Sequence, residues 1–200
     1  MSESYVSRRD RIISSAIELI SEVGLCAFNT RNLAARENIS EETLYKYFGG
    51  IEEVLVAVVD YYMQFDARIR QTVCSKQQSN IDKILAYFEA YATYYGNYYA
   101  ISTLMLQYEE LLHKSETREM IANCIVERVN FLQDLFQKAI DAGEISDVLT
   151  PWQLANNVTG MAMAHILARR IKKQKFSFKD GYMDNIRRYL SLVTLKDDNK

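Results

Sequence analysis

Apolar residues recur along this chain at the three- and four-residue spacing of amphipathic helices. The pattern is first clear between residues 12 and 23, where one helical face collects Ile12, Ile13, Ala16, Ile17, Ile20 and Val23. Gly24 follows at the point where a helix commonly ends in a left-handed conformation. We therefore predict a first helix that stops at Gly24.

Two short helices are predicted next, joined by a tight turn. Thr30 is of a residue type that caps helices and can begin the second helix. Asn38 can take the αL conformation that the turn requires, and Ser40 can cap a third helix over about residues 41–47. The apolar positions that would hold these helices on a small core are Leu33, Ala34, Leu44 and Phe48.

Longer helices are predicted for the rest of the chain. After Gly50, one apolar face collects Val54, Leu55, Val58, Val59 and Tyr62. Thr150 and Pro151 form a cap followed by a proline at the first helical position. One proline and seven glycines in 200 residues also favour an all-α fold. We expect the remaining helices over about 80–97, 100–113, 116–142, 151–173 and 180–194.

Composition excludes several classes of protein. With 48% apolar and 25% charged residues the chain is typical of a globular protein, and its net charge of −2 does not by itself indicate nucleic acid. No apolar run approaches the roughly 18 residues that span a bilayer, and the N-terminus lacks a secretory signal. We therefore expect a cytoplasmic protein without a membrane partner.

The sequence contains no recognisable catalytic or metal-binding motif. Cys26, Cys74 and Cys124 are odd in number and lack the spacing of a zinc site or disulfide framework. His113 and His165 are the only histidines and have no neighbouring ligand or catalytic pattern. We therefore expect no enzymatic activity, no cofactor and no metal.

A three-helix head with a tight turn between its last two helices is the helix-turn-helix arrangement. The residues of this segment whose spacing is informative are Ile13, Ala16, Ile20, Gly24, Thr30, Leu33, Ala34, Ile39, Ser40, Thr43, Leu44, Tyr45, Tyr47, Phe48, Glu52 and Glu53. At these positions, over about residues 8–60, the sequence resembles the TetR family of bacterial transcriptional regulators (TetR/AcrR-like). The resemblance implies an all-α fold of about nine helices. It places a DNA-binding head in residues 1–50 and an effector-binding and dimerisation domain in residues 51–200.

The resemblance also implies roles for individual residues of the head. Thr30 would cap the second helix and contact a phosphate, and Tyr47 with Lys46 would reach another phosphate. Leu44, Tyr45 and Phe48 would be structural. Ile51 replaces a lysine that is frequent in the family, which removes one phosphate contact. The complete set of predicted DNA-binding residues is Thr30, Arg31, Ser40, Glu41, Glu42, Thr43, Lys46 and Tyr47.

Glu41 and Glu42 begin the helix that would enter the major groove, although DNA is a polyanion. They can stabilise a short helix by offsetting its dipole, by about 0.3 to 1 kcal/mol each. One of them can instead accept a hydrogen bond from the N4 amine of cytosine. A third interpretation is that the two charges repel phosphate and have abolished DNA binding.

Two further surfaces are predicted behind the head. Tyrosines of the 80–97 helix can share one face, either as plain core or as the wall of an apolar effector pocket with a few polar groups. The predicted pocket residues are Phe88, Tyr91, Tyr95, Met105, Tyr108, Met161 and His165. A head of this kind reads a half-site, so a homodimer is expected. Its predicted interface residues are Ala155, Val158, Ala162, Ile166, Ile186, Tyr189, Leu190 and Val193.

Together these features predict a homodimeric, ligand-responsive regulator that binds a pseudo-palindromic operator in double-stranded DNA. We expect a repressor that a small lipophilic or aromatic effector releases from the operator. One alternative is a helical ligand-binding or partner-binding dimer that has lost DNA binding. A second is a small all-helical enzyme, and the absence of a catalytic motif counts against it. The sequence does not identify the operator, the regulated genes or the effector.

Overall fold

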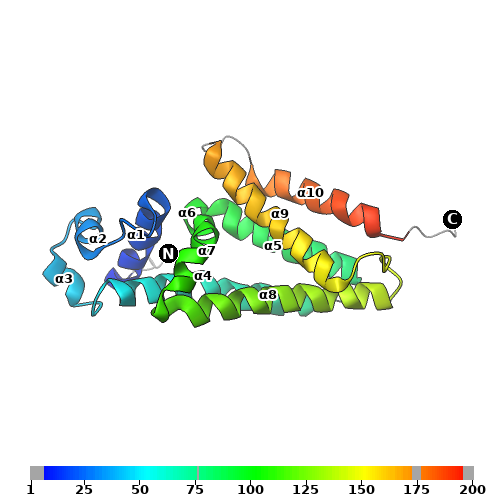
Figure 1. The fold of residues 1–200 in the computed structure, drawn as a ribbon, viewed down its shortest axis with the longest axis horizontal. Coiled ribbons are helices and arrows are strands. Elements are labelled where there is room, and N and C mark those ends of the chain that lie inside the picture. Colours follow the sequence, from blue (N-terminus) through cyan, green and yellow to red (C-terminus); the bar gives the residue numbers. More distant parts are fainter. Residues whose placement is uncertain (1–6, 76, 173–176, 196–200) are drawn as a thin grey trace, which may run out of the picture. The chain divides into compact units, whose positions relative to one another are not determined.

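The computed structural model describes residues 7–75, 77–172 and 177–195. Within these ranges the protein is helical, and an isolated bridge pairs Ile145 with Thr194, so the predicted all-α fold is confirmed. None of the described helices is long and apolar enough to cross a membrane. The elements, drawn in Figure 1, are α1 (Arg8–Val23), α2 (Thr30–Arg36), α3 (Glu41–Tyr45), α4 (Ile51–Cys74), α5 (Asn80–Asn97), α6 (Tyr99–Ser102), η1 (Thr103–Gln107), α7 (Tyr108–His113), α8 (Ser115–Asp141), α9 (Pro151–Ile171) and α10 (Phe178–Val193).

The helices form two compact units. The first unit contains residues 1–64 and 100–122, and the second contains residues 65–99 and 123–200. Helices α4 and α8 therefore each contribute residues to both units. The sequence resemblance implied a DNA-binding head in residues 1–50 and an effector-binding and dimerisation domain in residues 51–200. This division of roles stays a prediction.

Helix α1 forms the centre of the head. Ile12, Ala16 and Ile17 are fully buried, as their spacing predicted, whereas Val23 is 44% exposed and does not belong to the core face. Val23 is the last residue of α1, directly before the C-cap Gly24. Gly24 ends α1 with a φ of 75° and a ψ of 178°, a conformation that glycine adopts without a steric penalty.

The ends of α2 and α3 follow local capping chemistry. The predicted capping role of Thr30 is wrong, because Asn29 is the cap and accepts from the backbone N–H of Asn32 at 2.9 Å. Both residues can cap a helix, and the chain enters α2 one residue earlier than expected. Asn38 has the expected positive φ of 53°, and Ser40 caps α3 as predicted. Helix α3 ends at Tyr45, two residues before the expected end.

The later helices largely match the expected segments. The Thr150 side chain accepts from the N–H of Gln153, whose side chain in turn accepts from the N–H of Thr150, so α9 begins with a complete capping box. The expected helix over 100–113 is instead divided into α6, η1 and α7. The Thr103 hydroxyl donates to the carbonyl of Ala100 at 2.7 Å at this break. Lys173, the expected end of α9, lies outside the described residues.

Candidate nucleic-acid interface and effector site

The α2–α3 pair is attached to α1 through a small core and two polar links. Leu33 and Leu44 are buried to 0% and 1% exposure and anchor the two short helices. Arg36 donates to both carboxylate oxygens of Glu22 on α1, at 2.7 and 3.0 Å. This hydrogen bond lowers the pKa of Glu22 below its usual range. The turn between α2 and α3 is therefore fixed on both sides, as a helix-turn-helix requires.

The outer surface of α3 presents most of the predicted DNA-binding residues. Ser40, Glu41, Glu42, Lys46 and Tyr47 are exposed, as is Arg31 on α2, whereas Thr30 and Thr43 are half-buried. Tyr45, which we predicted to be structural, is 53% exposed and lies outside the core, because only Leu44 of α3 is buried. The head thus offers hydroxyl, phenol and ammonium groups to a ligand, and its DNA contacts stay a prediction.

Three of the predicted DNA-binding residues have hydroxyls that already have intramolecular partners. The Thr30 hydroxyl donates to Oε2 of Glu41 at 2.6 Å, and the hydroxyls of Ser40 and Thr43 are 2.9 Å apart. A hydroxyl has one hydrogen to donate. In the free protein Thr30 therefore bonds to a carboxylate, and a phosphate contact by Thr30 would require that bond to break.

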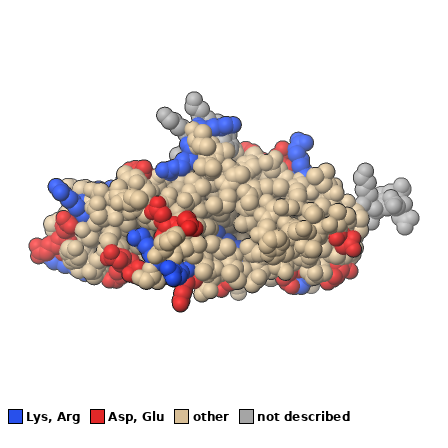
Figure 2. Space-filling view, in the orientation of Figure 1, with Lys and Arg blue, Asp and Glu red and all other residues tan. Residues whose placement is uncertain are grey.

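Charges of both signs are interspersed on the head. In the view of Figure 2, Lys and Arg side chains lie close to Asp and Glu side chains over α2 and α3. Arg9 is held on the head by its guanidinium, which lies 4.7 Å from the centre of the Phe48 ring. DNA recognition by this surface must therefore depend on the placement of individual groups.

In the second unit, three of the predicted effector residues form one aromatic cluster on α5. Phe88, Tyr91 and Tyr95 are each at most 4% exposed, and the ring centres of Tyr91 and Tyr95 are 4.2 Å apart. His165 on α9 reaches this cluster through Tyr182, whose ring centre lies 5.6 Å from His165 and 6.0 Å from Phe88. These contacts join α5, α9 and α10.

The other predicted effector residues are placed differently. Met161 is half-buried on α9. Met105 is buried in the first unit, and Tyr108 of the same unit shares a hydrogen bond with Tyr62. His165 also lines an open groove of about 650 Å³ between α9 and α10. None of these contacts tests whether the residues bind an effector, so the set stays a prediction.

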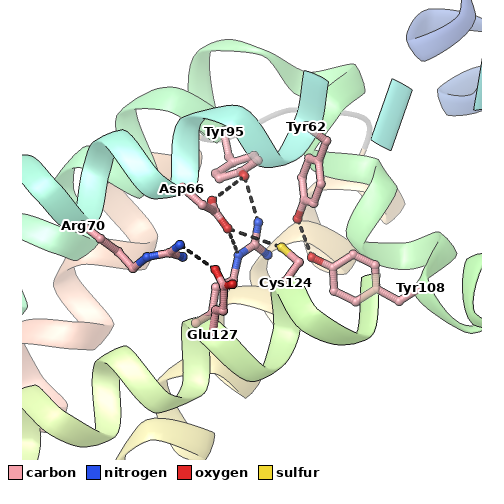
Figure 3. Close-up of polar contacts among 8 residues, drawn as sticks. Tyr62, Asp66, Arg70, Tyr95, Tyr108, Cys124 and Glu127 are labelled. Carbon is pink, nitrogen blue, oxygen red and sulfur yellow. Dashed lines mark hydrogen bonds and ion pairs between the residues drawn. The ribbon is translucent and has the colours of Figure 1, made fainter. Parts of the chain in front are cut away.

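A buried ion pair in the second unit was not foreseen from the sequence. Arg128 on α8 donates through Nε to Oδ2 of Asp66 on α4, and Arg128 Nη2 donates to the Tyr95 hydroxyl at 3.0 Å (Figure 3). The same hydroxyl donates to Oδ1 of Asp66 at 3.2 Å, and the Cys124 thiol lies 3.4 Å from Oδ2. Burial raises the pKa of Cys124 to about 12. A charged, hydrogen-bonded network thus lies beside the aromatic cluster.

The predicted dimer residues mostly face the core of their own unit. Ala155, Val158, Ala162, Ile166, Ile186, Leu190 and Val193 are all buried, and Tyr189 is half-buried. The outward face of α9 instead carries Trp152, Leu167 and Ile171, which are 59%, 49% and 71% exposed. Any pairing through α9 must use this outward face.

Comparison with known proteins identifies the head. Residues 12–58 match the family model of the bacterial regulatory proteins of the tetR family. Residues 12–58 therefore form a head of the TetR type. The matched residues run from α1 into α4 and include the complete α2–α3 pair, as the sequence resemblance predicted.

Similar proteins extend beyond the head. The fatty acid metabolism regulator protein of Bacillus subtilis is 24% identical over 140 residues, which is 70% of this chain and 71% of that protein. The ketosteroid transcriptional regulator KstR2 of Mycobacterium tuberculosis has the same fold, with a TM-score of 0.85 at 14% identity, covering 95% of this chain and 96% of that one. The regulator FadR of Bacillus subtilis, solved with stearoyl-CoA, gives a TM-score of 0.73 at 20% identity, covering 92% and 98%.

Proposed function

We propose that this TetR-family chain is a ligand-responsive repressor that binds operator DNA through α2 and α3. The observation that carries the proposal is the family match over residues 12–58, on a head whose α3 side chains are exposed. The second helix of a helix-turn-helix enters the major groove, and donors around it fix the register on the phosphates. The repressor acts on DNA as a regulator and not as an enzyme, and we place it in the cytoplasm.

The repressor acts as a homodimer on a pseudo-palindromic operator. Each head reads one half-site, and a two-fold axis relates the two heads. The outward face of α9 supplies the interface, because Trp152, Leu167 and Ile171 expose large apolar side chains there. Gly160 and Ala164 on the same face are small and exposed, which permits close approach of a partner helix.

The effector is a fatty acyl thioester of coenzyme A. The two relatives from Bacillus subtilis support this class, since one is named as a fatty acid metabolism regulator and the other was solved with stearoyl-CoA. In this chain the aromatic cluster around Phe88 and Tyr91 supplies an apolar wall for an acyl group. In the adjacent network, the guanidinium of Arg128 supplies N–H donors for a thioester carbonyl.

The effector acts on DNA binding through α4. This helix begins at Ile51, directly after the head, and carries Asp66 in the buried network. An effector that binds better when α4 is displaced shifts the population towards dimers whose head spacing no longer fits the operator. A preference of a few kcal/mol is sufficient for such a shift.

The test has two stages. Several rounds of selection from a random duplex pool should enrich a palindrome that the protein binds with a steep dependence on salt. Stearoyl-CoA should then release the enriched duplex, whereas free coenzyme A and free stearate at the same concentration should not. A reporter gene behind the enriched duplex should be silenced by the protein.

The outcomes separate the parts of the proposal. If no duplex is enriched, the chain is not a DNA-binding regulator. If a duplex is enriched but acyl-CoA thioesters of several lengths leave it bound, the effector class is wrong. If the reporter gene is activated, the repressor assignment is wrong.

A further inference from the structure

The two carboxylate oxygens of Glu41 have different surroundings. Oε2 accepts the hydroxyl hydrogen of Thr30 at 2.6 Å, so a residue of α2 holds the first side chain of α3. The residue as a whole is exposed, and a carboxylate can accept further hydrogen bonds on its second oxygen. The side chain is therefore held in one orientation while it keeps the capacity to accept from a ligand.

The position of Glu41 determines what that ligand is. Glu41 is the first residue of α3, and the N-terminal residues of the second helix of this motif contact base edges. A carboxylate is repelled by the surrounding phosphates, and a hydrogen bond from a base offsets this repulsion. In the major groove, the amine that glutamate typically contacts is N4 of cytosine.

We propose that Glu41 reads a cytosine in each operator half-site by accepting a hydrogen bond from its N4 amine through Oε1. Thr30 is the positioning residue that holds the carboxylate through Oε2. This inference rests on the proposed function and adds to it a base identity and the residue that selects the base. It also explains why an acid begins the helix that approaches DNA.

Glu42 provides the matched comparison. It is the next residue, it is exposed, and it carries the same charge in the same first turn. The single hydroxyl hydrogen of Thr30 is used by Glu41, so Thr30 does not hold Glu42. A general effect of negative charge on DNA affinity should appear at both positions, whereas base selection should appear only at Glu41.

The test repeats the duplex selection with the full-length wild type and with Glu41→Gln, Glu42→Gln, Thr30→Val and Thr30→Ser. The wild type should select cytosine at one position of each half-site over the other bases by about fivefold to a hundredfold. Glu41→Gln should lose this preference and admit adenine, which glutamine recognises. Glu42→Gln should retain the preference. Thr30→Val should weaken the cytosine preference. Thr30→Ser, which keeps a hydroxyl, should retain it.

Several results would overturn the inference. If Glu41→Gln binds all duplexes more tightly without a changed base preference, Glu41 only repels phosphate. If Thr30→Val weakens all duplexes equally, Thr30 is a phosphate contact and not a positioning residue. If the wild type selects a palindrome without that cytosine, this inference fails and the proposed function stands. If the wild type selects nothing, both fail. Circular dichroism spectra of the variants should match that of the wild type, which excludes misfolding.

Discussion

Arg128 and Asp66 form an ion pair in the interior of the second unit, with side chains that are only 7% and 5% exposed. Removing two charges from water costs several kcal/mol each, so such a pair persists only when its remaining hydrogen-bonding groups are satisfied. The Tyr95 hydroxyl provides that satisfaction, since it bonds to both partners. The pair therefore connects α4, α5 and α8 through one polar network.

Loss of one member of this pair should be costly. Asp66→Asn keeps the size of the side chain but leaves the Arg128 charge without a counter-charge. We expect the free energy of unfolding to fall by about 3 to 5 kcal/mol, measured by urea denaturation followed by circular dichroism. The control is Arg70→Met, which removes the pair with the 60%-exposed Glu127 and should cost no more than about 1 kcal/mol. If Asp66→Asn and Arg70→Met lower the free energy of unfolding equally, burial does not determine the cost of breaking the Asp66–Arg128 pair.

The cap of α2 can be tested by comparing neighbouring residues. Asn29→Ala removes the side chain that accepts from the N–H of Asn32 and should lower the free energy of unfolding by about 1 kcal/mol. Thr30→Ala removes only a hydrogen bond between exposed side chains and should cost less. Chemical denaturation of both variants measures the difference, and a larger loss for Thr30→Ala would mean that Thr30 is the true cap.

The three thiols should react at very different rates. Cys26 and Cys74 are exposed, whereas Cys124 is 3% exposed and burial raises its pKa to about 12. Because the thiolate is the reactive form, a disulfide reagent at pH 8 should modify two thiols quickly and the third only after unfolding. Rapid modification of all three thiols in the native protein would contradict the burial of Cys124.

The raised pKa of Cys124 also makes stability depend on pH. Above pH 9 the unfolded state releases the Cys124 proton, whereas the folded state retains it. This group therefore lowers the free energy of unfolding progressively between about pH 9 and pH 12.

The outward face of α9 can be tested by adding a charge to it. Leu167 is 49% exposed, so Leu167→Glu should leave the protomer folded and convert the proposed dimer into a monomer. Light scattering coupled to size exclusion measures the mass. Val126→Glu is the control, because Val126 is similarly exposed, at 54%, but belongs to α8 and not to α9. If Val126→Glu dissociates the dimer and Leu167→Glu does not, the interface lies on α8 and not on α9.

Local sequence signals predicted much of the fold because their causes are local. Ser40 caps α3, Asn38 has a positive φ, and Thr150 with Gln153 forms a capping box, each through bonds within a few residues. The same signals failed to distinguish Asn29 from Thr30, since both adjacent residues are competent caps. Which of the two residues caps α2 depends on where the helix begins, and tertiary packing determines that position.

Long-range relationships were not predictable in the same way. Asp66 follows Tyr62 by four residues, and Arg128 follows Cys124 by four, so both charges lie on the buried stripes of their helices. This placement was the available signal for a buried charge pair, but sequence spacing does not show which acid meets which base. Apolar spacing on α9 likewise selected the side chains that face the core and did not select the exposed apolar side chains Trp152, Leu167 and Ile171.

Helix α3 buries only one of its five residues, Leu44, and its cap Ser40 is exposed. Substitutions at its other positions therefore remove little packing energy, so the surface that we propose meets DNA is nearly independent of the residues that keep the head folded. A new operator preference is accessible to this protein through a few changes that leave its stability intact. Regulators with different target genes can diverge from such a head by point mutation, without passing through unfolded intermediates in their evolution.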